Sequence, residues 1–147
     1  MTLKLPKGTQ RVVPYLVYRD CRAAIEFLTK AFGFVERYHF PMEDGSIGHA
    51  ELGVDEDTVI YVASAVDAMG HTVPKDTGKR QGLICVYVPD CDAAYQQAKA
   101  AGATITSEPE DQFYGDRSFR AVDPEGYEWN FAQHIKEFDP STMAPPA

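Results

Sequence analysis

The sequence predicts an α+β fold made of two successive βαβββ modules. The first observation is an internal repeat, in which residues 20–24 (DCRAA) recur as residues 90–94 (DCDAA). The second is that each copy is preceded by a short apolar run and followed by three strand-like runs. A repeat of about half the chain length indicates two similar folded units rather than a solenoid of short repeats.

The first module begins with the apolar run 12–18, which is short enough to be a buried strand. Asp20 can cap the helix that follows, and Gly33 suits the left-handed position that ends one. One apolar stripe repeats at helical spacing between them: Cys21, Ala24, Ile25, Leu28 and Phe32. Three strands are then expected, at residues 35–41, 47–53 and 58–63.

The second module repeats this order, with a strand at 83–88, a cap at Asp90 and a helix stop at Gly102. Strand-like runs follow at residues 103–106, 117–122 and 127–132. The last two are separated by the strong turn signal Asp-Pro-Glu-Gly at 123–126. Long loops are expected at 64–81 and 108–116, and a poorly ordered tail from Asp139 to Ala147.

Length and composition indicate one globular domain, residues 1–138, holding modules at about 11–63 and 82–134. The formal net charge of −8 argues against a nucleic-acid partner, because no stretch concentrates Lys and Arg. No long apolar run predicts a membrane span, and the N-terminus has no signal-peptide pattern. Three cysteines without CxxC spacing fit a reducing compartment, so a cytoplasmic location is expected.

Two segments of the second module carry a family resemblance. Residues 114–118 (YGDRS) and 123–129 (DPEGYEW) closely resemble the final hairpin of bleomycin-resistance-like proteins. With the repeat, residues 11–134 resemble the vicinal oxygen chelate superfamily, which includes the glyoxalases. The resemblance implies an eight-stranded open barrel around a cavity, with the helices outside, and a homodimer whose partner chains often help to form the binding site.

Enzymes of this superfamily hold a divalent metal through residues on the first and fourth strand of each module. Counting from the helix caps and the last turn places these positions near Val13, Ile84, Asn130, and either Ile60 or Tyr61. None of these residues is a strong ligand, whereas the chemistry needs His, Gln or Glu. We therefore expect that the inherited metal site is lost and that the chain uses no metal or other cofactor.

His49 and Glu51 are the polar pair that remains. They lie two residues apart on an expected strand, so their side chains share one face of the sheet. If that face is the cavity, they could be a ligand clamp, an acid–base pair or half of a relocated metal site. The alternative is a solvated outer face, because period 2 does not say which way the face points. Cys21, Cys91 and Cys85 are all interpreted as core residues.

Aromatic residues favour a planar organic ligand, because flat apolar rings with polar tips bind such molecules by stacking. Trp129 and Phe131 are expected to pack beneath the helices, on the face opposite Asn130. The predicted ligand-binding residues are Tyr15, His49, Glu51, Phe113, Tyr114 and Asn130.

The sequence therefore favours a metal-free protein, more plausibly not an enzyme, that sequesters a small organic ligand, planar or cationic, in an inter-module or dimer cavity. The alternative is a glyoxalase-like or dioxygenase-like enzyme with a relocated metal site. A metal-free enzyme that uses His49 or Glu51 as a base is a third hypothesis.

Overall fold

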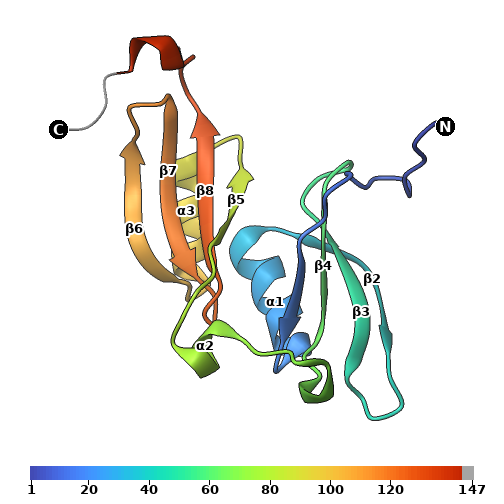
Figure 1. Cartoon of the computed structure of the whole chain (residues 1–147). Helices are drawn as coiled ribbons and strands as arrows, with labels where there is room; N and C mark the ends of the chain where they lie inside the picture. The colour runs from blue at the N-terminus through green and yellow to red at the C-terminus, as the bar shows by residue number, and fades with distance from the viewer. Residues whose placement is uncertain (144–147) are drawn as a thin grey trace.

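A computed structural model describes residues 1–143 of the 147-residue chain and contains the two expected βαβββ modules (Figure 1). The first module is β1 (Tyr15–Tyr18), α1 (Cys21–Phe32), β2 (Val35–Pro41), β3 (Ile47–Gly53) and β4 (Val59–Ser64). The second is β5 (Leu83–Tyr87), α3 (Cys91–Ala100), β6 (Thr104–Asp111), β7 (Asp116–Val122) and β8 (Glu128–His134). Short helical turns complete the described chain: η1 (Asp67–Met69), α2 (Pro74–Thr77) and η2 (Pro140–Thr142).

Each module forms its own four-stranded mixed sheet. The strand orders are β1-β4-β3-β2 and β5-β8-β7-β6, and in each sheet only the first pair is parallel. Figure 1 shows the sheets as separate layers, with α3 against the C-terminal sheet and α1 between that sheet and the N-terminal one. The residues described contain these two open sheets and no closed eight-stranded barrel.

Both main helices begin where the sequence predicts, and α1 also ends there, whereas α3 ends at Ala100 with Ala101 as its cap, one residue before the expected Gly102. The carboxylates of Asp20 and Asp90 accept hydrogen bonds from the backbone N–H of Ala23 and Ala93, which satisfies one free donor in each first turn. α1 ends at Gly33, whose φ of 73° lies in the left-handed region that glycine adopts without strain.

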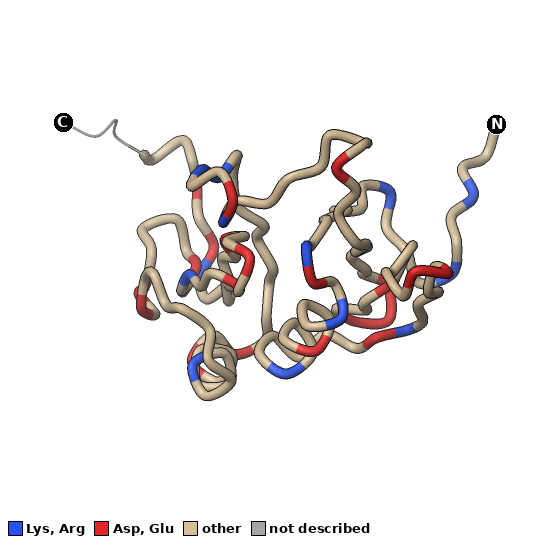
Figure 2. Tube along the Cα trace, turned by 90° about the horizontal axis from the view of Figure 1, so that it is seen from below, with Lys and Arg blue, Asp and Glu red and all other residues tan. Residues whose placement is uncertain are grey.

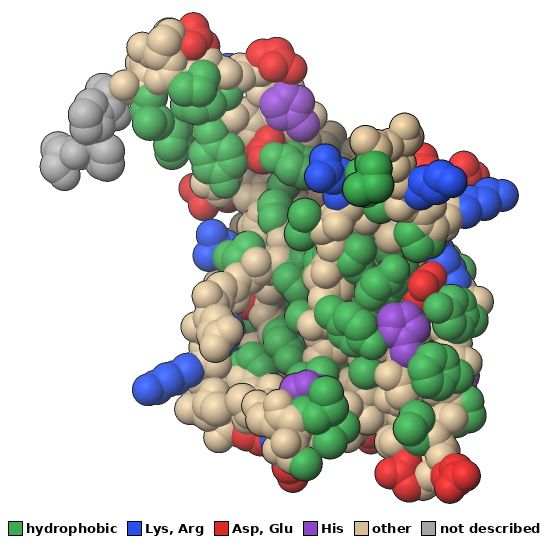
Figure 3. All heavy atoms as spheres, turned by 45° about the vertical axis from the view of Figure 1, so that its right-hand side comes forward, with side chains coloured by type: hydrophobic (Ala, Val, Ile, Leu, Met, Phe, Trp, Pro, Cys, Tyr) green, Lys and Arg blue, Asp and Glu red, His purple; other side chains and the backbone are tan. Residues whose placement is uncertain are grey.

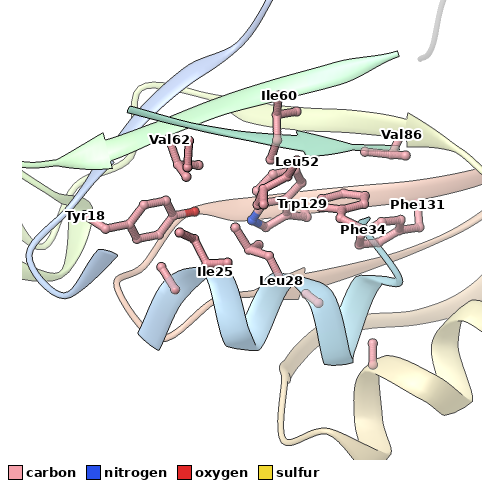
Figure 4. Packing of buried hydrophobic residues seen from close by; sticks show 14 of the residues in the cluster. Tyr18, Ile25, Leu28, Phe34, Leu52, Ile60, Val62, Val86, Trp129 and Phe131 are labelled. Atoms are coloured by element: carbon pink, nitrogen blue, oxygen red, sulfur yellow. The ribbon is translucent and has the colours of Figure 1, made fainter. Parts of the chain in front are cut away.

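One continuous core joins the modules (Figure 4). Side chains from α1 and from the helix-facing sides of both sheets point toward one another in this view. The ring of Trp129 lies 5.4 Å from that of Phe32 and 5.6 Å from that of Phe34, measured between centroids. Trp129 and Phe131 are almost fully buried, which confirms that they pack on the helix side of their sheet.

The turn at residues 123–126 fastens the second module to the start of the first helix. The buried carboxylate of Asp123 accepts hydrogen bonds from the Tyr18 hydroxyl at 2.7 Å and the Trp129 indole at 3.2 Å. Glu125 accepts the backbone N–H of Asp20 at 2.9 Å. Burial raises the pKa of Asp123, while these donors favour its charged form.

The prediction of a loop at residues 108–116 is wrong for most of that segment. β6 continues through Glu108, Pro109 and Glu110 to Asp111, which leaves only a tight turn at 112–115. Charges and proline indicate a loop in a sequence, yet β6 is the outer strand of its sheet, where both are tolerated because one edge is unpaired.

The other boundaries differ by a few residues. β1 begins at Tyr15 rather than at residue 12. The connection at 64–81 is long, as predicted, but it contains η1 and α2, and Arg19 holds it through ion pairs with Asp67 at 2.6 Å and Asp76 at 2.9 Å. Of the tail expected to be poorly ordered, residues 144–147 lie outside the described part.

Candidate functional site

His49 and Glu51 lie on the face of the N-terminal sheet that points away from α1, which we call the open face. Their strand neighbours Ala50 and Leu52 point into the core and are fully buried. The strand register sets Tyr15 opposite Tyr61 and Phe40 opposite His49. The side chains that share this face are Tyr15, Val17, Tyr38, Phe40, His49, Glu51, Tyr61 and Ala63.

Two tyrosines hold the polar pair in place. The Tyr15 hydroxyl lies 2.6 Å from Nδ1 of His49, and the Tyr38 hydroxyl donates to Glu51 at 3.0 Å. Nε2 of His49 lies 3.8 Å from Glu51 Oε1, which is within ion-pair distance. The side chains of His49 and Glu51 are only 18% and 16% exposed, so neither is a freely solvated surface group.

Aromatic rings surround the imidazole of His49. Its centroid lies 4.8 Å from the ring of Tyr61, 5.4 Å from that of Tyr15 and 6.0 Å from those of Tyr38 and Phe40. Partial burial raises the pKa of Tyr15, so its hydroxyl stays protonated and can donate to the imidazole. We call Tyr15, Tyr38, Phe40, Tyr61, His49 and Glu51 the aromatic cluster.

A wide groove of about 1240 Å³ adjoins the aromatic cluster. Its lining includes Tyr15 and Phe40 from the cluster, and Met42 and Met69 from the loops beyond it. Figure 3 shows a face on which a histidine sits among hydrophobic side chains, with a carboxylate beside it. The charged residues that line the groove, Glu43 and Asp44, are both acidic. His71 also lines the groove. The cluster and the groove together therefore offer ring faces, two imidazoles and negative charge.

The remaining predicted ligand residues lie elsewhere in the chain. Phe113 and Tyr114 occupy the turn between β6 and β7, where Phe113 also contacts the ring of Phe138. Asn130 lies on the open face of the C-terminal sheet, and its amide donates to the Cys85 thiol at 3.4 Å. The structure brings together Tyr15, His49 and Glu51 in the aromatic cluster, and of the six predicted residues only Tyr15 lines the adjoining groove.

The strand register shows which way the side chains at the positions expected for metal ligands point. The pair Tyr15 and Tyr61 in the N-terminal sheet is equivalent to the pair Cys85 and Asn130 in the C-terminal sheet. All four side chains point to the open faces of their sheets. Ile60 and Ile84 point toward the core instead, and Val13 lies before β1. Two phenols and a neutral amide are weak ligands and Cys85 alone is a strong one, so these four positions do not supply the three strong ligands typical of a catalytic divalent metal. Among residues 1–143 no three His, Cys, Asp or Glu side chains are grouped to hold one.

The interpretation of Cys85 as a core residue is wrong. It is exposed on the open face of β5, whereas Cys21 and Cys91 are buried as predicted. A five-residue apolar run does not show which of its alternating side chains point outward. Burial raises the pKa of the Cys21 thiol to about 12, so this cysteine is an unreactive core group.

The predicted ligand-binding set lacks three members of the aromatic cluster: Phe40, Tyr61 and Tyr38. Tyr38 is the one that sequence reasoning did not consider as an aromatic candidate at all. It lies on the outer strand β2 with Phe40, two residues along and therefore on the same face. Pairing β2 with β3 places Tyr38 opposite Glu51. Tyr38 and Phe40 are spaced two residues apart, as are His49 and Glu51 on the next strand. This matching spacing was the sequence signal that could have identified Tyr38 as a site residue.

Comparison with known proteins supports this fold. The sequence profile described as "Glyoxalase/Bleomycin resistance protein/Dioxygenase superfamily" matches residues 10–131. An uncharacterized protein of Mycobacterium bovis is 36% identical over 126 residues, 84% of this chain and 83% of that protein. An uncharacterized protein of Mycobacterium tuberculosis H37Rv is also 36% identical over 126 residues, with 84% of this chain and 74% of that protein covered.

Solved structures agree with the sequence matches. TioX from Micromonospora sp. ML1 superimposes with a TM-score of 0.66 at 26% identity, over 86% of this chain and 99% of TioX. The fosfomycin resistance protein FosX from Listeria monocytogenes has a TM-score of 0.62 at 14% identity, over 84% and 92% of the two chains, which is a likeness of fold alone. The chain belongs to the glyoxalase/bleomycin resistance protein/dioxygenase superfamily, the vicinal oxygen chelate proteins.

Proposed function

We propose that this protein binds and sequesters a small organic molecule, planar and cationic, on the aromatic cluster. The observation that carries the proposal is the ring of Tyr15, Tyr38, Phe40 and Tyr61 around His49, beside a groove that, among residues 1–143, is lined by two carboxylates and no Lys or Arg. Tyrosine and phenylalanine faces attract cations as well as flat rings, and Glu51 supplies a half-enclosed carboxylate.

The charge of the whole chain favours the same kind of ligand. Lys and Arg are interspersed with Asp and Glu along the described trace (Figure 2), while the complete sequence carries 22 acidic and 14 basic residues. The resulting negative field would attract a cation and repel an anion of equal shape. In the described residues, no helix is long and apolar enough to cross a membrane. The proposed site of action is the cytoplasm, where free cysteines persist.

We further propose that a second copy of the chain closes the cavity. Tyr15, Tyr38 and Phe40 are each about half exposed in one chain, and a contiguous apolar patch of this kind is typical of an interface. A four-stranded sheet of the second copy would then complete the eight-stranded open barrel. Light scattering at micromolar concentration should give twice the 16.3 kDa chain mass, and Phe40→Glu should lower it. A single 16.3 kDa species in the wild type would exclude the dimer.

The second candidate is a glyoxalase-like or dioxygenase-like metal enzyme with a relocated site. It is favoured by the paired imidazole and carboxylate of His49 and Glu51, which could supply two metal ligands. It is opposed by their neighbours, because the groups that contact them are phenols and a phenyl ring rather than a third strong ligand.

The test is a thermal-shift screen of the full chain against planar aromatic cations, neutral aromatics of similar shape and a panel of divalent metals. We expect stabilisation by planar cations such as proflavine and a weaker response to the neutral compounds. A strong response to one metal, with none to any organic compound, would overturn sequestration and support the enzyme.

A further inference from the structure

A second groove, of about 670 Å³, lies at the seam between the modules. It is bounded by β1 and β5, which are the unpaired edge strands of their two sheets. Leu16 and Ile84 line it from these strands and Tyr127 from the end of the last turn; all three are partly buried against the core. Residues 72–82 of the long connection form its other side.

The charges at this groove are opposite in sign to those of the aromatic cluster. Lys79 and Arg80 are consecutive cations on its rim, in a chain that is acidic as a whole. The Arg80 side chain is oriented by its Nε, which donates to the Gly126 carbonyl at 3.0 Å. Within residues 1–143, neither the terminal guanidinium nitrogens of Arg80 nor the Lys79 ammonium makes a hydrogen bond or an ion pair with another side chain.

Glu128 is the acidic residue in the lining, and its carboxylate is engaged elsewhere. It accepts a hydrogen bond from the Thr106 hydroxyl at 3.3 Å, on the open face of the C-terminal sheet. The Tyr127 hydroxyl is also occupied, since it donates to the Val17 carbonyl at 2.8 Å. Tyr127 therefore offers the groove its ring rather than its polar tip.

We propose that this inter-module groove is a separate binding site for a small apolar carboxylate. The carboxylate would pair with the guanidinium of Arg80 and the ammonium of Lys79, while the apolar part covers Leu16, Ile84 and Tyr127. A guanidinium that is already oriented loses less conformational freedom when it pairs with a carboxylate. The site is independent of the proposed function, because its residues are not those of the aromatic cluster.

Benzoate is the probe, and benzamide is its neutral counterpart of nearly the same shape. In an NMR titration of the ¹⁵N-labelled full chain, we expect benzoate to shift the backbone amides of residues 79–84, 127 and 128. Benzoate should bind at least about fivefold more tightly than benzamide, because only benzoate gains the charge-assisted pairing. The double variant Lys79→Gln/Arg80→Gln should abolish this preference.

Two further variants distinguish the contribution of Lys79 alone from a general effect of removing positive charge. Lys79→Gln alone leaves the contact between Arg80 and Gly126 intact and should weaken benzoate by about twofold. The charge-matched control Lys4→Gln/Lys7→Gln, in the exposed N-terminal segment, should change nothing. Equal binding of benzoate and benzamide would overturn the proposal, as would shifts confined to the aromatic cluster or benzoate binding that survives the double variant. Equal binding of the two probes, or binding that survives the double variant, would leave the proposed cation site untouched, whereas shifts confined to the aromatic cluster would also count against its preference for cations.

Discussion

The open faces of the two sheets differ, although the modules that carry them share one topology. The N-terminal face is aromatic and surrounds a partly buried imidazole and carboxylate. On the C-terminal face, the corresponding strands present a thiol, an amide and a guanidinium: Cys85, Asn130 and Arg120. The helix-facing sides are alike, because both supply the common core. In the two copies of the module, the side of the sheet that forms the core is thus alike, whereas the open face differs.

The C-terminal face also has its own hydrogen-bonded network. Asp116, which is 5% exposed, accepts the Tyr87 hydroxyl at 2.8 Å and lies 3.1 Å from Nδ1 of His134. The other ring nitrogen of His134 lies 3.1 Å from Glu137. This network ties the end of β8 to the start of the C-terminal segment, whereas the N-terminal cluster faces a groove. We therefore propose that the C-terminal face is structural and that the N-terminal face binds the ligand.

The largest expected effect comes from breaking the core that both modules share. Asp123→Ala removes the acceptor of Tyr18 and Trp129 and leaves buried donors unsatisfied, so we expect a loss of about 3 kcal/mol in the free energy of unfolding. Urea unfolding measures it. Asp57→Ala, in an exposed turn, is the control and should change stability by less than about 0.5 kcal/mol. An equally small loss at Asp123 would mean that its hydrogen bonds to Tyr18 and Trp129 contribute little and that the apolar core alone holds the modules together.

The second prediction compares the reactivity of the cysteine on the open face of the C-terminal sheet with that of the two cysteines in the core. Cys85 is exposed while Cys21 and Cys91 are buried, so a disulfide-exchange reagent should modify one cysteine of the native chain at least about a hundredfold faster than the others. Mass spectrometry of the labelled peptides identifies the residue. Cys85→Ser should remove the fast phase. If Cys21 reacted as quickly, α1 would not be packed as the structure shows.

The third prediction tests the binding face. Phe40→Ala removes a ring stacked on His49 and should weaken proflavine by about tenfold, measured by fluorescence titration. Glu51→Gln should weaken this cation but leave a neutral aromatic unchanged, because only the charge is removed. Met143→Ala, at an exposed apolar side chain outside both sheets, is the control. Unchanged binding in Phe40→Ala would move the ligand away from the N-terminal face.

The smallest expected effect concerns the C-terminal network and depends on pH. Hydrogen bonding to Asp116, and then to Glu137, raises the pKa of His134 above its ordinary 6.5. A raised pKa in the folded state means that this stabilisation is complete below about pH 6.5 and is lost as pH rises through the higher value. The difference in Tm between wild type and His134→Gln should therefore be larger at about pH 5.5 than at about pH 8.5. A difference that grows with pH would contradict the assignment.

The sequence predicted the modules well because caps and periodicity are local signals. Asp20, Gly33 and Asp90 take the places expected of them, and β2 and β3 have the expected bounds. It failed at β6, where an outer strand tolerates residues typical of loops. It also failed at Cys85, because a short apolar run does not tell which face is buried.

The site was predicted less completely than the fold. Period 2 placed His49 and Glu51 on one face, but only the packing of Ala50 and Leu52 against α1 shows that this face is the open one. The placement of Tyr38 beside Glu51 depends on the pairing of β2 with β3, and the sequence of either strand alone does not specify that pairing. Phe113 and Tyr114 were chosen for their type, and the turn that carries them lies away from the groove.

The turn at 123–126 has a consequence for synthesis on the ribosome. Tyr18, in the first strand, donates a hydrogen bond to Asp123, which lies 105 residues later in the chain. The Val17 carbonyl accepts one from Tyr127, 110 residues later. The N-terminal module therefore cannot finish packing until most of the chain has emerged. Contacts so distant in sequence slow folding, and for that interval the half-made core and the aromatic strands are exposed together. The nascent chain should depend on chaperones late in translation, and truncations before Asp123 should accumulate as aggregates rather than as a smaller folded domain.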